Sequence, residues 1–412
     1  MKELESQAGN NGGYQRNRQL MAFLAVALLG AMASSLGDAA QNTDDPAYLT
    51  LQGDHAVSVR DSHTLAPIAM IPTDGQSIDS RITPDGTKLY TLNVGSPKMT
   101  VIRAKCPANK DDWNDTERAA GKCVPDTQLP AVTIPGSGGF YFSIRHDGKI
   151  IYVTSSSPDP AAPKDANPFN SSLSFIYAID THTDKILKTL SPPRGKVAIA
   201  GEISPDGKTL WIATADGFLQ GLDPNLGSPL TPTVFVGLVP ATIKCSPDGN
   251  RVYAANMPPG PGMPGAPPQA DKSAAPPVAT VGVVDTKSLK LVKSISMTPG
   301  SAITGIEMVG QRNQVWTANG NDTVSVIDTR SLQVVKTITT PFSLAEAVDV
   351  SIDGERALVI GFNGKLFDPG TATPAAKAPA FAQLYSTKTF EPIGDLVSLG
   401  NNSGGIPSLS AQ

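Results

Sequence analysis

A short turn ending in Asp-Gly recurs along the 412-residue chain, and this repeat limits the available folds more than any other feature. Gly accepts a positive φ and Asp tolerates a tight turn, so Asp-Gly between two β-rich runs predicts a hairpin. Such runs follow each turn, as in KLYTLN, TLWIAT and RVYAAN. A sixth run, QVWTAN, follows a degenerate turn near Gln311. The five clear turns begin at Thr83, Arg145, Ser204, Ser246 and Ser351.

A second repeat adds two further strands to each unit. It consists of alternating apolar residues, a turn that most often starts with Asp, and another apolar run, as in TVSVIDTRSLQVVKTI from Thr323. Three of the spacings between successive turns are 43 residues, and insertions lengthen the others. Four strands in about 40 to 50 residues is the spacing of a propeller blade. The seven turn residues are Asp61, Ala104, Asp180, Asp223, Asp285, Asp328 and Ser386.

Together the repeats predict an all-β protein, a seven-bladed β-propeller with four antiparallel strands in each blade. The N-terminal unit contains only three strands, within residues 48–51, 56–61 and 65–71. The last residues, GGIPSLSAQ from Gly404, resemble the strand that normally precedes the hairpin turn. We therefore expect the C-terminal strand to close the first blade. Residues 41–412 are expected to form one domain.

Several runs come close to a known repeat. Tyr152-Val153-Thr154-Ser155, Trp316-Thr317-Ala318-Asn319 and Tyr253-Ala254-Ala255-Asn256 are variants of one motif, and Val324 to Thr329 matches its second half. The units therefore resemble the YVTN repeat of exported and surface propellers in bacteria and archaea, over about residues 48–410. The resemblance implies a propeller fold and export. That family includes binding, surface and enzymatic proteins, so the resemblance implies no single function.

The N-terminus carries features of an export signal. Arg16 and Arg18 precede an apolar run at 20–33, and Ala31-Met32-Ala33 is a candidate cleavage site. The run is shorter than the roughly 20 apolar residues that span a membrane. We expect residues 1–40 to be a signal peptide with a short leader. The mature protein is then periplasmic or secreted, a monomer, and without a permanent membrane anchor.

The cysteines fit an oxidising compartment. Cys106 and Cys123 bracket one polar insertion and could form a local disulfide there, whereas Cys245 lies in an apolar strand pattern and is expected in the core. The insertion at 105–127 falls in a third-to-fourth-strand loop. It could be a stapled helix that carries Trp113 as a partner-binding knob, or merely an ordered loop.

Aligning the inner strands on their turns places one polar residue at an equivalent position in each. Alternation with a period of two points this set toward the central channel. A hydrated channel whose charges satisfy one another is the preferred interpretation, because structural ion networks are common. The ring residues are Arg81, Ser143, Glu202, Lys244, Glu307 and Asp349, with Ser408 on the proposed closing strand.

Three insertions, at 155–172, 256–279 and 362–379, fall in second-to-third-strand loops and hence on one face of the disc. Insertions that share a face of a repeat protein often mark its binding face, and the alternative is that they are Pro/Ala-rich spacers. A ligand at that mouth of the channel would first meet five residues. These candidate binding residues are Asp74, Tyr141, Arg194, Glu346 and Asn401.

Two functions remain open. The first is an exported scaffold that binds an envelope protein, a glycan or a small molecule on the long-loop face. The second is a periplasmic enzyme that uses the channel mouth, either a lactonase-like hydrolase or a component of a quinone or haem redox system. The chain has no C-x-x-C-H, H-E-x-x-H or G-x-S-x-G motif. We therefore favour the scaffold and assign no catalytic residue.

The same search predicts no cofactor and no metal site. Carboxylates and carbonyls at the channel mouth are nevertheless the ligands that Ca²⁺ and Mg²⁺ prefer, so binding of either ion stays open. The net charge of −4, without a basic run, argues against a nucleic-acid partner.

Overall fold

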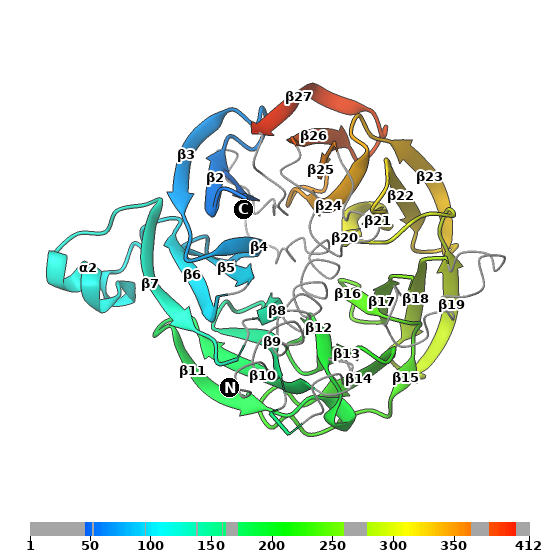
Figure 1. Cartoon of the computed structure of the whole chain (residues 1–412), viewed down its shortest axis with the longest axis horizontal. Helices are drawn as coiled ribbons and strands as arrows, with labels where there is room; N and C mark the ends of the chain where they lie inside the picture. The colour runs from blue at the N-terminus through cyan, green and yellow to red at the C-terminus, as the bar shows by residue number, and fades with distance from the viewer. Residues whose placement is uncertain are drawn as a thin grey trace, which may run out of the picture.

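The strands are arranged as seven antiparallel sheets around a central axis. The structure, a computed structural model, describes residues 46–51, 53–94, 96–136, 139–158, 160–161, 172–258, 278–363 and 379–400. In these ranges six sheets have four strands and the N-terminal sheet has three. Seen along the axis, the sheets are arranged radially around a central channel (Figure 1). The chain is therefore a seven-bladed β-propeller, which confirms the fold predicted from the repeats.

Within each blade the strands follow chain order from the channel to the rim. The first three blades contain β1 (Ala47–Leu51), β2 (Ala56–Arg60) and β3 (Pro67–Pro72); β4 (Gln76–Ile82), β5 (Lys88–Val94), β6 (Lys98–Arg103) and β7 (Thr127–Thr133); and β8 (Gly139–Ile144), β9 (Ile150–Pro158), β10 (Ser172–Asp180) and β11 (Lys185–Leu190). Blades four and five contain β12 (Ala198–Ile203), β13 (Leu210–Thr214), β14 (Phe218–Leu222) and β15 (Val234–Phe235); and β16 (Pro240–Cys245), β17 (Arg251–Asn256), β18 (Thr280–Asp285) and β19 (Lys290–Ser296). Blades six and seven contain β20 (Gly305–Val309), β21 (Gln314–Ala318), β22 (Thr323–Asp328) and β23 (Gln333–Thr339); and β24 (Leu344–Val350), β25 (Arg356–Phe362), β26 (Ala380–Ser386) and β27 (Pro392–Gly400).

Within the described residues, helical segments occur only in connections between strands. They are η1 (Lys110–Asp112) and α2 (Asp115–Ala120) between β6 and β7, η2 (Pro193–Gly195) between β11 and β12, and η3 (Gly310–Arg312) between β20 and β21. The last of these replaces the Asp-Gly turn that is degenerate in blade six. Asn313 closes η3 with a φ of 56°, so it takes the left-handed conformation that Gly takes in the other blades.

The Asp-Gly turns owe their shape to side-chain contacts within the motif. In blade five, Ser246 Oγ donates to Asp248 Oδ1 at 2.5 Å and accepts from the amide of Arg251 at 2.9 Å. Gly249 has a φ of 68°, which would strain a residue with a side chain. Equivalent contacts recur around Ser204 and Ser351. The motif therefore specifies both the turn and the register of the two strands it joins.

The second repeat forms an equally local turn between the third and fourth strands. Asp285 Oδ1 accepts from the amide and the hydroxyl of Ser288, at 2.7 and 2.8 Å. The amide of Leu289, at a φ of 55°, donates to the Asp285 carbonyl. The turns that begin at Asp61, Asp180 and Asp328 have the same side-chain contacts.

The ring closes where blade seven meets blade one. Leu49 of β1 belongs to one buried cluster with Leu358 and Leu384 of blade seven. On the face of the Asp-Gly turns, Arg356 Nη1 donates to the carbonyl of Ser62 at 2.9 Å. The described part of blade one has three strands, as predicted. The segment from Gly404 that is expected to supply its inner strand lies outside the described residues.

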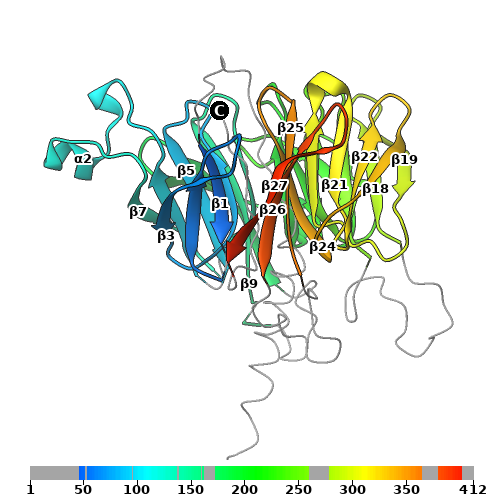
Figure 2. The same cartoon turned by 90° about the horizontal axis from the view of Figure 1, so that it is seen from above.

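The two faces of the disc carry different connections. Seen edge-on, the strands run between the faces, and α2 projects from the rim (Figure 2). Second-to-third-strand connections and the connections between blades share one face, which we call the loop face. First-to-second and third-to-fourth-strand turns share the other, the turn face. The ladder between β9 and β10 extends to the pair Pro158 and Ser172, so the blade-three insertion starts later than predicted.

Candidate functional site

The six predicted ring residues all lie on the innermost strands and are buried. In each blade the ring residue stands opposite a residue of the second strand, as in the pairs of Arg81 with Tyr90, Glu202 with Trp211 and Lys244 with Tyr253. Their exposed fractions are at most 4%. Charged side chains buried to this degree need partners, because an isolated buried charge is costly.

Ion pairs connect the ring residues between blades. Arg81 Nη1 lies 3.7 Å from Glu202 Oε2, which links blade two to blade four past blade three. Lys244 Nζ lies 3.0 Å from Glu307 Oε2 and links blades five and six. Asp79, two residues before Arg81, approaches its Nε at 3.6 Å. We did not single out Asp79 from the sequence, although alternation along a strand puts it on the same side as Arg81.

Tyr141 belongs to this buried cluster rather than to an open mouth. It is fully buried, and its hydroxyl lies within hydrogen-bond distance of two acceptors, Glu202 Oε2 at 3.2 Å and the carbonyl of Ile243 at 3.1 Å. The Arg81 guanidinium lies 4.9 Å from the centroid of its ring. Tyr141 therefore fills the space in blade three between the partners Arg81 and Glu202.

Burial brings the pKa values of two carboxyls in this cluster close to neutral pH. It raises the pKa of Asp79 to about 7, although Arg81 and Lys244 oppose the shift. It also raises the pKa of Glu307 to about 7 against the effect of Lys244. Neither Asp79 oxygen and none of the Arg81 nitrogens makes a hydrogen bond of good geometry within the protein. Asp79 and Arg81 are thus held by electrostatic contacts and keep unused hydrogen-bonding capacity.

Asp74 and Arg194 lie on the loop face, and both are engaged with neighbouring side chains. Asp74 Oδ2 accepts from Gln128 at 2.8 Å and from Thr100 at 3.1 Å, which ties the connection from β3 to blade two. Arg194 pairs with Asp216 at 3.1 Å and stacks over the ring of Phe218 at 4.3 Å. Asn401 lies outside the described residues.

Glu346 differs from the other candidates because it has no protein partner for one of its oxygens. It is 5% exposed, and its Oε2 makes no hydrogen bond within the protein. Burial alone raises its pKa to about 8, without an opposing charge. The register between β24 and β25 shifts between Ala345 and Ala347, so Glu346 occupies a β-bulge without an opposite residue.

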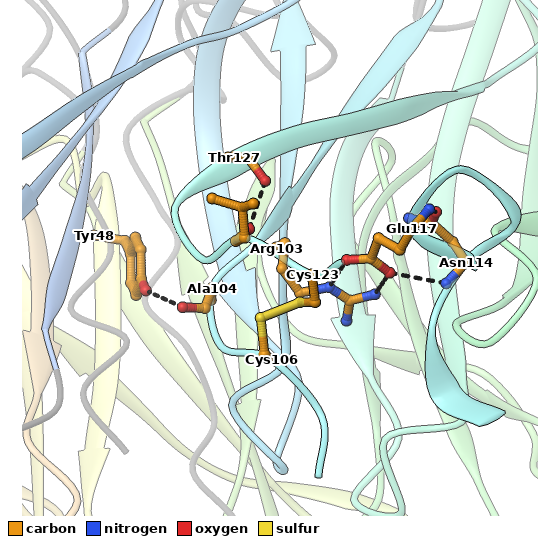
Figure 3. Close-up of a disulfide and its surroundings, with 9 residues drawn as sticks. Tyr48, Arg103, Ala104, Cys106, Asn114, Glu117, Cys123 and Thr127 are labelled. Carbon is orange, nitrogen blue, oxygen red and sulfur yellow. Dashed lines mark hydrogen bonds and ion pairs between the residues drawn. A yellow bond between two sulfur atoms is a disulfide. The ribbon is translucent and has the colours of Figure 1, made fainter. Parts of the chain in front are cut away.

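The insertion between β6 and β7 is a stapled element at the rim of blade two (Figure 3). Cys106 and Cys123 form a disulfide with a Cα–Cα distance of 5.9 Å. Glu117 of α2 accepts from Arg103 through both its oxygens, at 2.7 and 2.5 Å, and also from the amide of Asn114. The pair of Arg103 and Glu117 is buried, and sequence alone did not reveal it, because the two residues approach only once the loop folds back on β6.

The described ranges contain neither a cluster of metal-ligating side chains nor a membrane-spanning helix. There, no three His, Cys, Asp or Glu side chains are grouped so that they could hold a metal ion. No helix in those ranges is both long and apolar enough to cross a membrane.

Comparison with known proteins supports the fold and nothing finer. No protein-family model matches the chain, and no curated protein does either. Among solved structures, Kuenenia stuttgartiensis hydrazine synthase is similar at 16% identity with a TM-score of 0.59, over 86% of this chain and 99% of that one. A functionally unknown protein from Desulfotomaculum acetoxidans DSM 771 is similar at 12% identity with a TM-score of 0.60, over 89% of this chain and 99% of that one. At such identities the likeness shows a shared propeller fold.

Proposed function

We propose that the protein is an exported binding scaffold that takes its partner on the loop face. The observation that carries this proposal is the arrangement of the strand ends that flank the long insertions. Those insertions follow the ends of β9, β17 and β25, and the equivalent place of these strands in their blades puts the three ends on the loop face. The propeller core then serves as a rigid support, and rigid support lowers the entropic cost of binding through loops.

Blades with a long connection between the second and third strands are separated by one or two blades with a short one. In blades two, four and six the second strand reaches the third within a few residues, between Val94 and Lys98, Thr214 and Phe218, and Ala318 and Thr323. In blades three, five and seven the same connection is much longer. The strand ends that carry the insertions are therefore separated from one another by blades with a short connection.

The blade-five insertion offers the sharpest test, because its removal leaves both flanking strands paired. Asn256 stands opposite Thr280 at the end of the ladder. A Gly-Ser-Gly linker in place of residues 259–277 should therefore leave the melting temperature unchanged. We expect this variant to lose the partner that the intact protein captures from a periplasmic extract after chemical cross-linking.

A matched control alters the opposite side of the molecule. Asp115 and Arg118 are exposed on α2 and pair with each other at 2.7 Å, so their joint replacement by alanine should change neither stability nor capture. Equal capture by the shortened protein and the intact one would refute the proposal. Loss of capture in the α2 control would move the binding surface to the rim.

Export and membership of the YVTN-repeat propellers are part of the same proposal. The disulfide between Cys106 and Cys123 supports export, because stable disulfides belong to oxidising compartments. The apolar run at 20–33 supports it independently. Mass spectrometry of the N-terminus in separated cell fractions tests this part: an intact Met1 in the cytoplasmic fraction would contradict it.

Glu346 supports a second candidate function, an enzyme at the channel mouth. A buried carboxyl with its pKa raised to about 8 keeps its proton at neutral pH and can act as a general acid. A lactonase-like hydrolase would use it to protonate a leaving oxygen. Loss of hydrolysis in Glu346→Ala with an unchanged fold would support this function, and an absorbance spectrum of the purified protein tests the redox version.

A further inference from the structure

Glu346 departs from the rule that the other blades follow at the same place. The inner strands of blades two to five have the same β-bulge, which holds Ile78, Phe140, Ile199 and Ala241. In blade six the equivalent residue is Thr304, one position before the start of β20, and its hydroxyl donates to the carbonyl of Ala345 at 3.4 Å. Blade seven thus places a carboxyl where blades two, four and five have an apolar side chain and blade six has a partnered hydroxyl. A break in a local rule without a compensating contact is a common mark of a functional position.

The surroundings of Glu346 place it near the loop face. The blade-six connection packs directly on the preceding residue, since the amide of Gly320 donates to the carbonyl of Ala345 at 3.0 Å. At the start of blade seven, the amide of Ser343 donates to Asn363 Oδ1 at 3.0 Å, just after β25 ends. A group bound by Glu346 would therefore lie at the base of one long insertion.

The charge of the inner strands favours a positively charged ligand at this place. Five of their side chains are acidic and two are basic, and both basic residues are already paired elsewhere, with Glu202 and Asp79 and with Glu307. Burial is the cause of the raised pKa of Glu346, and neither basic side chain offsets it. The acidic residues are Asp79, Glu202, Glu307, Glu346 and Asp349, and the basic ones are Arg81 and Lys244.

We propose that Glu346 is the anchor of a binding site for a primary ammonium group at the loop-face end of the channel. An ammonium supplies both the positive charge and the N–H donor that the unpartnered Oε2 lacks. A metal ion fits less well, because no group of three potential ligands occurs in the described residues. This inference rests on the proposed function, since it names the ligand chemistry of the same face.

Isothermal titration calorimetry with propylamine at pH 7 tests the site. Binding should ionise a carboxyl that otherwise keeps its proton, so close to one proton should be released for each amine bound. The heat of binding should therefore differ between phosphate and HEPES buffers by their heats of ionisation, and neither buffer contains a primary amine that would compete for the site. 1-Propanol has the same size without the charge and should bind at least tenfold more weakly.

Substitutions assign the effect to this side chain. Glu346→Gln should weaken propylamine binding at least tenfold and abolish the proton release, whereas Glu391→Gln, at an exposed position, should do neither. Glu346→Asp keeps the charge on a shorter side chain and should retain proton release with weaker binding. It therefore separates the role of the charge from that of the side-chain length. Equal binding of propylamine and 1-propanol, or binding unaffected by Glu346→Gln, would overturn the proposal.

A second probe separates the two sources of an ammonium group. Nα-acetyl-lysinamide stands for the lysine side chain of a partner, and propylamine for a free amine. Tighter binding of Nα-acetyl-lysinamide indicates a lysine side chain as the ligand, and tighter binding of propylamine indicates a free amine. The amine site and the scaffold function can also fail separately: amine binding that survives removal of residues 259–277, together with unchanged partner capture, would retain the site and reject the scaffold.

Discussion

Replacing Glu346 with glutamine should stabilise the propeller, and more strongly at neutral than at acidic pH. The side chain is 5% exposed and its carboxyl has a pKa raised from 4.5 to about 8 by burial. The folded state therefore binds this proton more tightly than the unfolded state does. The free energy of unfolding consequently falls as the pH rises through the interval between these two pKa values.

The magnitude follows from the two pKa values. Linkage gives a loss of about 1 kcal/mol at pH 5 and about 3 kcal/mol at pH 7, relative to pH values below 4. The amide of glutamine does not titrate, so Glu346→Gln removes this loss. Any fixed cost of burying the amide is the same at both pH values. The gain from the substitution should thus be about 2 kcal/mol larger at pH 7 than at pH 5.

Urea unfolding of both proteins at pH 5 and pH 7, followed by tryptophan fluorescence, measures this difference directly. Asp79 and Glu307 titrate in the same range but are present in both proteins, so their contributions cancel. Glu391→Gln is the control and should give the same difference at both pH values. A stability change for Glu346→Gln that does not depend on pH would refute the assignment of a raised pKa to this carboxyl.

Three further predictions concern the ring, the knob and the tail. Arg81→Met leaves Asp79 and Glu202 without their buried partner and should cost about 3 to 5 kcal/mol in denaturant unfolding, whereas Arg145→Met, in an exposed pair, should cost less than about 1 kcal/mol. Serine at both Cys106 and Cys123 opens a loop with a sequence separation of 17 and should lower stability by at most about 3 kcal/mol, with faster hydrogen exchange confined to residues 103–127; exchange that rises evenly throughout the chain would contradict this. Truncation after Gly400 should lower the melting temperature and expose β1 to exchange if the tail closes blade one, and an unchanged melting temperature would reject that closure.

The turn motifs carried most of the information about the fold. Ser246 hydrogen-bonds to Asp248 and to the hairpin backbone, and Asp285 accepts hydrogen bonds from Ser288, three residues further along the chain. These contacts lie within a few residues of one another, so a linear pattern reveals them. Repetition of the pattern then gave the number of blades and the identity of the inner strands.

What the sequence by itself determined is therefore the propeller, its seven blades and the face on which the long insertions emerge. Only the tertiary structure decided which side chains meet across the channel. Arg81 reaches Glu202 past blade three, and Tyr141 lies between them instead of at the mouth. Such contacts depend on how neighbouring blades are rotated and packed, and no local pattern encodes that. The bulge that isolates Glu346 is likewise a property of strand pairing, which becomes visible only when β24 and β25 lie side by side.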